Sequence, residues 1–278
     1  MSVGSVGRLR QAISDAVAGP VAEAHKYVQH QGQVSIDETS FQQGNADGHN
    51  PKGMKGWLWV ALTPLVCYFL VLLSRSHAAA QTILGSAFAG YVNSDRYSAY
   101  TWLALEQRQV CWAHLKRDTK IAERSGVSRE LGESLLKQHE QLFELWHRVR
   151  DGTLERRQFV VEVEPIRQSV HRLLTQAANY AIAEGEKTPL AKTVRTCQQV
   201  LKVESALWLF VMVEGIEPTN NAAEQAIRPA VLWRKCSYGS QSAEGSLFVG
   251  RMMTVVTSLR RQQRHVLDYL TVACRAQR

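Results

Sequence analysis

Residues 56–73 (GWLWVALTPLVCYFLVLL) place the strongest constraint on the fold, because they carry no charge over nearly the length of a membrane span. Thr63 and Pro64 divide this segment into two apolar runs of about seven residues, both rich in β-branched and aromatic side chains. Two adjacent buried strands joined by a turn have this pattern. A membrane span is the alternative, and the sequence disfavours it because no second apolar segment of this kind follows.

Two further predicted strands end at aspartates. Residues 34–38 (VSIDE) indicate a strand that ends in Asp37 and Glu38, and residues 91–94 (YVNS) indicate one that leads to Asp95. Together with the apolar pair and a short fifth strand, they place about five strands in the first 115 residues. Helical segments lie between them, which is typical of an α/β protein.

The helical patterns begin before the first strand. Residues 5–30 indicate short amphipathic helices broken at Gly19 and Pro20, and residues 76–89 indicate a helix that ends at Gly90. After the predicted fifth strand, residues 109–112, the strand patterns stop. Apolar side chains at steps of three and four then predict amphipathic helices that build a core of their own. The predicted domains are an N-terminal helical segment (1–30), a first part of the α/β core (31–115), a helical insertion (116–213) and a last part of that core with basic C-terminal helices (214–278).

The net charge indicates the class of partner, and the cysteine content indicates the cellular compartment. The chain of 278 residues has a formal net charge of +8 and a pI near 9.4, which favours a polyanion such as nucleic acid or an anionic membrane. From Arg228 onward, nine basic residues face two acidic ones, a net charge of +7. The five cysteines are odd in number and form no C-x-x-C pair, and no apolar signal-peptide region precedes the first strand. We therefore expect a cytoplasmic, nucleoid-associated protein.

Three carboxylates form the candidate site: Asp37 and Asp95 at strand ends, and Glu224 in the polar segment 214–245. Glu224 follows Asn221 by three residues, so the carboxylate of a helix capping box is an alternative reading. Phosphoryl transfer by two divalent ions requires acidic oxygen ligands that converge from rigid elements, and Mg²⁺ prefers such ligands. The three acids together are therefore candidates for a magnesium site.

Five phrases of the sequence resemble the catalytic region of DDE transposases of bacterial insertion-sequence family sixty-six. They are VSIDETSF, KGWLWV, SDRYSAY, CWAHLKRD and EPTNNAAEQAIRPAVLWRKCSYGSQSAEGS, and the resemblance spans about residues 20–275. It implies a ribonuclease-H-like mixed sheet with a large α-helical insertion before the last catalytic helix. It also implies that Asp37, Asp95 and Glu224 are the catalytic, metal-binding triad.

The implied activity is hydrolysis at insertion-sequence ends followed by strand transfer, with two Mg²⁺ ions, or Mn²⁺ as a substitute. The implied partners are double-stranded DNA at element ends and target, other copies of the chain and accessory proteins of the same element, with no membrane. The basic C-terminal part is expected to hold the phosphate backbone. The residues expected to contact DNA are Arg228, Arg234, Lys235, Arg260 and Arg261.

Two departures from the family pattern qualify this expectation. Ser35 and Ser40 stand where many relatives have the His and Gly of H-x-D-E-T-G, and neither position is a metal ligand. Full-length relatives also carry N-terminal coiled-coil, zinc-binding and DNA-binding features, so we expect an N-terminally truncated copy or a fragment with little preference for terminal repeats. A catalytically silent DNA-binding remnant and a ribonuclease-H-like nuclease without strand transfer remain alternatives.

Two residues are second-tier candidates. His114, at a predicted strand-to-helix junction, has the chemistry of a ligand or general base, although a structural role is the more common use of such a histidine. Trp233 stands beside Arg234 and Lys235, which makes it a candidate DNA contact. Trp57, Trp59 and Trp112 alternate with apolar neighbours and are predicted to lie in the core of the sheet.

Overall fold

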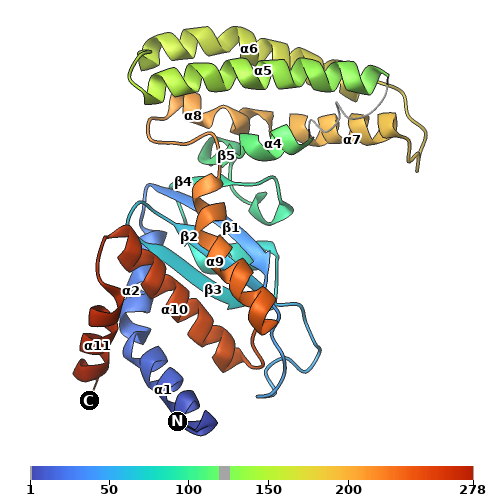
Figure 1. Ribbon diagram of the computed structural model, residues 1–278. Helices are drawn as coiled ribbons and strands as arrows, with labels where there is room; N and C mark the ends of the chain where they lie inside the picture. Colours follow the sequence, from blue (N-terminus) through green and yellow to red (C-terminus); the bar gives the residue numbers. More distant parts are fainter. Residues whose placement is uncertain (1, 119–125, 278) are drawn as a thin grey trace. The chain divides into compact units, whose positions relative to one another are not determined.

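The computed structural model describes residues 2–118 and 126–277 and divides into two compact units. The first, here called the sheet unit, comprises Met1–Ala104 and Asn220–Arg278, and the second, the helical unit, comprises Leu105–Thr219. Residues 119–125, part of the predicted insertion, lie outside the described residues. Strands and helices share the sheet unit, which confirms the predicted α/β, ribonuclease-H-like class (Figure 1).

Four strands of the sheet unit lie in the order β3, β2, β1, β4 (Figure 1). β1 pairs antiparallel with β2, β2 pairs antiparallel with β3, and β1 pairs parallel with β4, so the sheet is mixed as predicted. The four strands are β1 (Gln33–Ser40), β2 (Trp57–Leu62), β3 (Cys67–Leu72) and β4 (Tyr91–Ser94). The prediction that the first strand ends at Asp37 and Glu38 was wrong, because Thr39 and Ser40 still pair with β2 and place Asp37 inside β1.

The apolar segment 56–73 forms β2 and β3, as its division at Thr63 and Pro64 predicts. The connecting turn is closed at Thr63, whose backbone N–H donates to the carbonyl oxygen of Val66 at 2.8 Å and whose hydroxyl donates to the same oxygen at 2.9 Å. Among the described residues, no helix combines the length and the apolar character that crossing a bilayer requires.

The two faces of the sheet carry separate buried clusters. Trp59 and Ala61 of β2 belong to one buried cluster, which includes apolar side chains of α2 and α3. Leu58 and Val60 belong to the cluster on the other face, together with side chains of α9. α10 contributes to both clusters and runs beside the edge strand β3. These helices are α2 (Ala18–Gln29), α3 (His77–Leu84), α9 (Asn221–Ser237) and α10 (Ala243–Arg261).

β3 is an edge strand, and hydroxyl groups of α10 bind its outward-facing backbone N–H groups. The backbone N–H of Phe69 donates to Oγ1 of Thr254 at 2.9 Å, and that of Cys67 donates to Oγ of Ser258 at 3.0 Å. The two hydroxyls stand four residues apart and so share one helix face. They satisfy strand donors that would otherwise be open to pairing with another chain.

Two helix boundaries differ from the sequence prediction. α3 ends at Gly85 rather than at Gly90, because Gly85 adopts a φ of +88° that terminates the helix. The N-terminal break falls at Val17, between α1 (Val3–Ala16) and α2, whereas Pro20 lies inside the first turn of α2. Proline is tolerated there because backbone N–H groups of the first turn have no partner within the helix.

The helical unit packs long amphipathic helices around a core of their own. Trp146 of α5, Phe159 of α6 and Phe210 of α8 are in ring contact, with centroid distances of 5.3–6.0 Å. The elements are β5 (Arg108–Val110), α4 (Trp112–Asp118), α5 (Val127–Arg150), α6 (Arg156–Ala178), α7 (Pro189–Leu201) and α8 (Leu209–Met212). α11 (Val266–Ala276) completes the sheet unit.

Trp112 corrects one prediction. It begins α4 rather than ending a strand, and it packs in the helical unit instead of the core of the sheet. Its Nε1 donates to the carbonyl oxygen of Leu207 at 2.7 Å, and its ring lies 5.0 Å from that of Trp208. The backbone N–H of Trp112 donates to the carbonyl oxygen of Pro218, so it takes part in no strand ladder.

Candidate active site

The register of β1 places its two acids on opposite faces of the sheet. Asp37 pairs with Val60, and Glu38 pairs with Trp59. Residues directly opposite each other in an antiparallel pair point to the same face. Asp37 therefore lies on the face that α9 covers, and Glu38 lies on the face that α3 covers.

The Asp37 carboxyl has a pKa raised from 3.8 to about 7. Burial is the largest cause, and the negative charge of Glu38 is the next. The N–H of Glu38 donates to Oδ1 of Asp37 at 2.9 Å and lowers the pKa, whereas the charges of Asp95 and Glu224 raise it further. The structure therefore brings all three predicted acids of the triad within electrostatic reach of one another.

Asp95 directly follows β4 and is held in a tight turn. The backbone N–H of Tyr97 donates to Oδ1 of Asp95 at 2.8 Å. A side-chain oxygen that accepts a backbone N–H two residues on fixes the carboxylate relative to the strand end. Asp95 therefore has the strand-end position that the sequence predicts.

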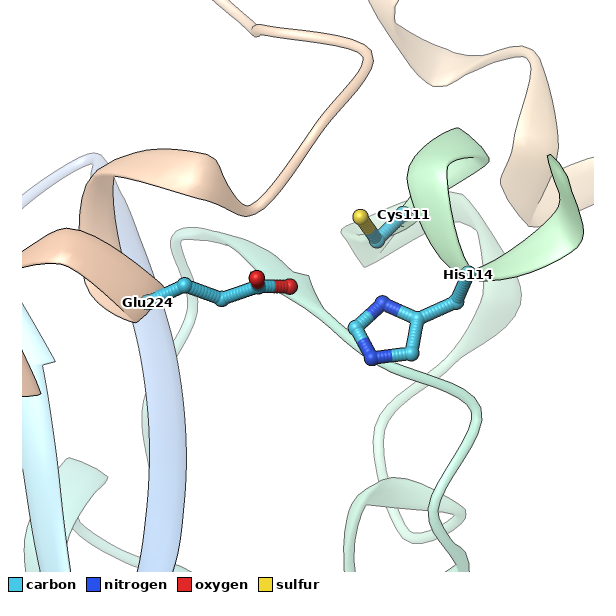
Figure 2. A group of neighbouring side chains, drawn as sticks. All are labelled: Cys111, His114 and Glu224. Carbon is cyan, nitrogen blue, oxygen red and sulfur yellow. The ribbon is translucent and has the colours of Figure 1, made fainter. Parts of the chain in front are cut away.

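Glu224 lies in the first turn of α9 (Figure 2). The N-cap of this helix is Asn220, so Glu224 is the fourth helical residue, one position beyond that of a capping-box carboxylate. The Asn220 side chain makes no capping bond and instead donates from Nδ2 to the carbonyl oxygen of Ile36 at 2.8 Å. The start of α9 is thereby fastened to β1 one residue before Asp37.

A second set of hydrogen bonds joins the C-terminal end of α9 to β1. Nη1 of Arg234 donates to Oγ1 of Thr39 at 2.8 Å, to Oγ of Ser40 at 2.7 Å and to the carbonyl oxygen of Ser40. Arg234 is half-buried. Ser40, which stands where the family has glycine, supplies two of these three acceptors, and its Oγ is one that a glycine would lack. Arg234 thus has a structural task in addition to the DNA contact expected of it, which stays a prediction.

The other predicted DNA contacts fall into two groups. Arg228 and Lys235 are exposed on α9, and Arg228 follows Glu224 by one helical turn. Arg260 and Arg261 are exposed at the C-terminal end of α10, a helix of 19 residues and so about 28 Å long. Arg261 donates from Nε to the carbonyl oxygen of Pro64 at 2.9 Å.

Trp233 and His114 stay second-tier predictions. Trp233 is half-buried and packs against the apolar cluster beneath α9, which accounts for much of its surface. His114 is half-buried in the first turn of α4, three residues after the buried Cys111 (Figure 2). Cys111 and His114 belong to the helical unit, whereas the three acids belong to the sheet unit.

Sequence reasoning missed the environment of Glu38. Its side chain is fully buried and pairs with Arg75, whose Nη2 lies 2.6 Å from Oε1, while the hydroxyl of Tyr100 donates to Oε2. Burial raises the pKa of Glu38, and the bonds from Tyr100 and Arg75 oppose that rise. The alternation of buried Val34 and Ile36 is the signal that predicts a buried Glu38. No sequence spacing points to Arg75, which is 37 residues away.

The triad has the donor chemistry of a site for hard divalent cations. Carboxylate oxygens are the ligands that Mg²⁺ and Mn²⁺ prefer. The observation that tests this fit is the raised pKa of Asp37, which arises from burial and from three neighbouring negative charges. A bound divalent cation would relieve that repulsion. The residues present therefore fit such an ion.

Comparison with known proteins agrees with the motif resemblance. A family model described as Transposase IS66 family matches residues 2–247. A Sinorhizobium fredii protein described as Uncharacterized protein y4qI is 26% identical in an alignment of 292 residues. The alignment covers 97% of this chain and 51% of that protein. The chain thus spans about half the length of this relative. No solved structure matches the chain. Since the family model covers most of the sequence, the chain belongs to the Transposase IS66 family.

Proposed function

We propose that the sheet unit holds the catalytic centre of a DDE-type transposase that cuts DNA at insertion-sequence ends and joins the freed ends to target DNA. The observation that carries this proposal is the convergence of three carboxyl groups: Asp37 within β1, Asp95 directly after β4 and Glu224 in the first turn of α9. The negative charges of Asp95 and Glu224 both raise the pKa of Asp37. Membership of the transposase family gives the substrate class, DNA.

Asp37, Asp95 and Glu224 would hold the divalent ions, two Mg²⁺ with Mn²⁺ as a substitute. When bound, such ions supply a hydroxide-like nucleophile and stabilise charge on the attacked phosphate. The protein's own part is to hold the three carboxylates close together. Asn220 and Arg234 contribute to this by fastening α9, and hence Glu224, to β1.

Arg228 is the basic residue best placed to bind substrate near the triad. It is exposed and follows Glu224 by four residues, so both side chains lie on one helix face. An arginine there would hold a DNA phosphate and position the duplex without reading its sequence. Lys235, Arg260 and Arg261 would extend the phosphate contact.

The test uses the full chain and a labelled duplex that carries the terminal repeat flanking the gene in its own element. With Mg²⁺ present, we expect cleavage that leaves a 3′-hydroxyl, followed by joining to a supercoiled target. Asp37→Asn, Asp95→Asn and Glu224→Gln should each abolish cleavage while DNA binding persists. Glu244→Gln is the matched control, because Glu244 lies in the first turn of α10 as Glu224 lies in that of α9, and it is exposed.

The products separate the alternatives. Cleavage without joining would assign a nuclease in place of a transposase. DNA binding without cleavage under any divalent ion would identify a catalytically silent remnant. The three ligands act as a unit, so a double variant should be no worse than a single one. Cleavage by Glu224→Gln at the wild-type rate would show that Glu224 is not a catalytic residue.

A further inference from the structure

Arg75 is the cation of a buried network beside the triad. Its backbone lies in the connection between β3 and α3, where Nε1 of Trp59 donates to the carbonyl oxygen of Ser74 at 3.2 Å. From there the guanidinium reaches Oε1 of Glu38 with two donors, Nη2 at 2.6 Å and Nε at 2.7 Å. Tyr100 binds the other carboxylate oxygen of Glu38. Both carboxylate oxygens of Glu38, the residue next to Asp37, are therefore hydrogen-bonded.

The same guanidinium contacts the turn that carries Asp95. Its central carbon lies 3.6 Å from the ring centroid of Tyr97 and 4.7 Å from that of Trp57. The backbone N–H of Tyr97 in turn donates to Oδ1 of Asp95 at 2.8 Å. A guanidinium stacked on an aromatic ring is attracted to its face and restricts its movement.

We infer that Arg75 is a positioning residue that fixes the separation of the Asp37 and Asp95 carboxylates by binding Glu38 on β1 and Tyr97 beside Asp95. The inference rests on the proposed function, since that separation matters for ions shared by the two carboxylates. Arg75 acts through its neighbours, because its donors are directed at Glu38 and Glu38 lies on the sheet face opposite to Asp37.

A role in stability alone is a poor account of this network. Replacing a buried ion pair by well-packed apolar residues is often neutral or stabilising, so such a pair is weak evidence of a contribution to stability. Mutation of a group that orients a metal ligand, in contrast, lowers the affinity for the metal about 10-fold to 100-fold. The two roles therefore predict different responses of metal affinity.

The test is titration of the full chain with Mn²⁺ alone, with free Mn²⁺ followed by electron paramagnetic resonance, beside thermal unfolding. Arg75→Lys loses the two-donor geometry, and Tyr97→Leu loses the ring while it keeps the Glu38 pair and the backbone N–H. We expect each to raise the Kd for Mn²⁺ about 10-fold. Tyr97→Phe retains the ring and should restore the wild-type Kd. Arg251→Lys is the control, because Arg251 is a half-buried arginine of the same unit, bound to Ser14 and Asp15.

Each outcome decides a different statement. If wild-type protein binds Mn²⁺ and both Arg75→Lys and Tyr97→Leu bind it equally well, the positioning role is overturned while the proposed function stands. A lower Tm with an unchanged Kd has the same meaning, since it shows a purely structural role. If wild-type protein binds Mn²⁺ no better than Asp37→Asn does, the proposed metal site itself fails, and the positioning role fails with it. Should Arg75→Lys not fold, Tyr97→Leu decides.

Discussion

Nδ2 of Asn220 donates to the carbonyl oxygen of Ile36 at 2.8 Å, and the bond is buried. Asn220 stands immediately before α9, and Ile36 stands immediately before Asp37. One hydrogen bond thus joins the backbone next to Asp37 to the start of α9, the helix that carries Glu224. It ties segments separated by 184 positions in the sequence.

The first prediction concerns this bond. Asn220→Ala leaves a buried carbonyl oxygen without its donor, which should lower the free energy of unfolding by about 1–3 kcal/mol. Asn220→Asp should be worse, because a carboxylate oxygen would then face the Ile36 carbonyl. Chemical denaturation measures both, and Asn221→Ala, at the exposed neighbouring position, is the matched control. Equal stability of Asn220→Ala and Asn221→Ala would show that the bond contributes little.

The second prediction concerns the stability of the metal-free protein as a function of pH. A pKa of about 7 for Asp37 in the folded state, against 3.8 ordinarily, means that folding favours the protonated carboxyl. Its contribution to stability is therefore complete below about pH 4 and is lost as the pH rises through 7. The difference between these two pKa values corresponds to about 4 kcal/mol.

Asp37→Asn should accordingly be more stable than wild type at pH 8 in EDTA, and equally stable near pH 4. Its stability curve should become shallower without becoming flat, since the pKa of Glu38 is also raised. Urea denaturation at several pH values provides the measurement. Glu244→Gln, at an exposed position of α10, should leave the curve unchanged. Mg²⁺ should stabilise wild type but not Asp37→Asn at pH 8, because it binds only the folded site.

The third prediction concerns DNA affinity. If Arg228 binds one phosphate, Arg228→Gln should weaken binding of every duplex alike and lower the slope of log K against log salt by about 0.9. Lys235→Gln should do the same. Lys26→Gln is the control, because Lys26 is an exposed cation on α2, which packs against the opposite face of the sheet. Filter binding at three salt concentrations tests this, and an unchanged slope for Arg228→Gln would remove that contact.

The fourth prediction separates Arg234 from its exposed neighbours. Because Arg234 binds Thr39 and Ser40 of β1, Arg234→Gln should lower the free energy of unfolding by about 1–3 kcal/mol, whereas Lys235→Gln should not. Thermal unfolding of the two variants compares adjacent residues of equal charge. Wild-type stability for Arg234→Gln, combined with a lower salt slope, would show that Arg234 serves DNA alone.

The sequence predicted those parts of the fold that depend on local pattern. Thr63 and Pro64 marked the turn between β2 and β3, and the position of Asp95 directly after β4 followed from a short apolar run. The end of β1 was misplaced, because the polar residues Thr39 and Ser40 continue the pairing with β2 beyond Asp37. The end of α3 was misplaced because both Gly85 and Gly90 satisfy a helix stop, and only the observed φ of Gly85 distinguishes them.

The supporting groups of the site could not be predicted in the same way. Arg75, Tyr97 and Asn220 act through contacts between segments far apart in the sequence, and neither periodicity nor composition encodes such pairings. Glu38 is the intermediate case. Its burial follows from strand alternation, but the identity of its cation follows only from the packing of the β3 to α3 connection beside β1.

The placement of Asp37 and Glu38 on opposite faces of β1 makes the site sensitive to changes in chain length. An insertion or deletion of a single residue in β1 moves every following side chain to the other face. Glu38 would then point toward α9 and Asp37 toward Arg75, so the two acids would exchange neighbours with no change in either residue. In this strand, an insertion or deletion of one residue is therefore expected to abolish activity more completely than most substitutions.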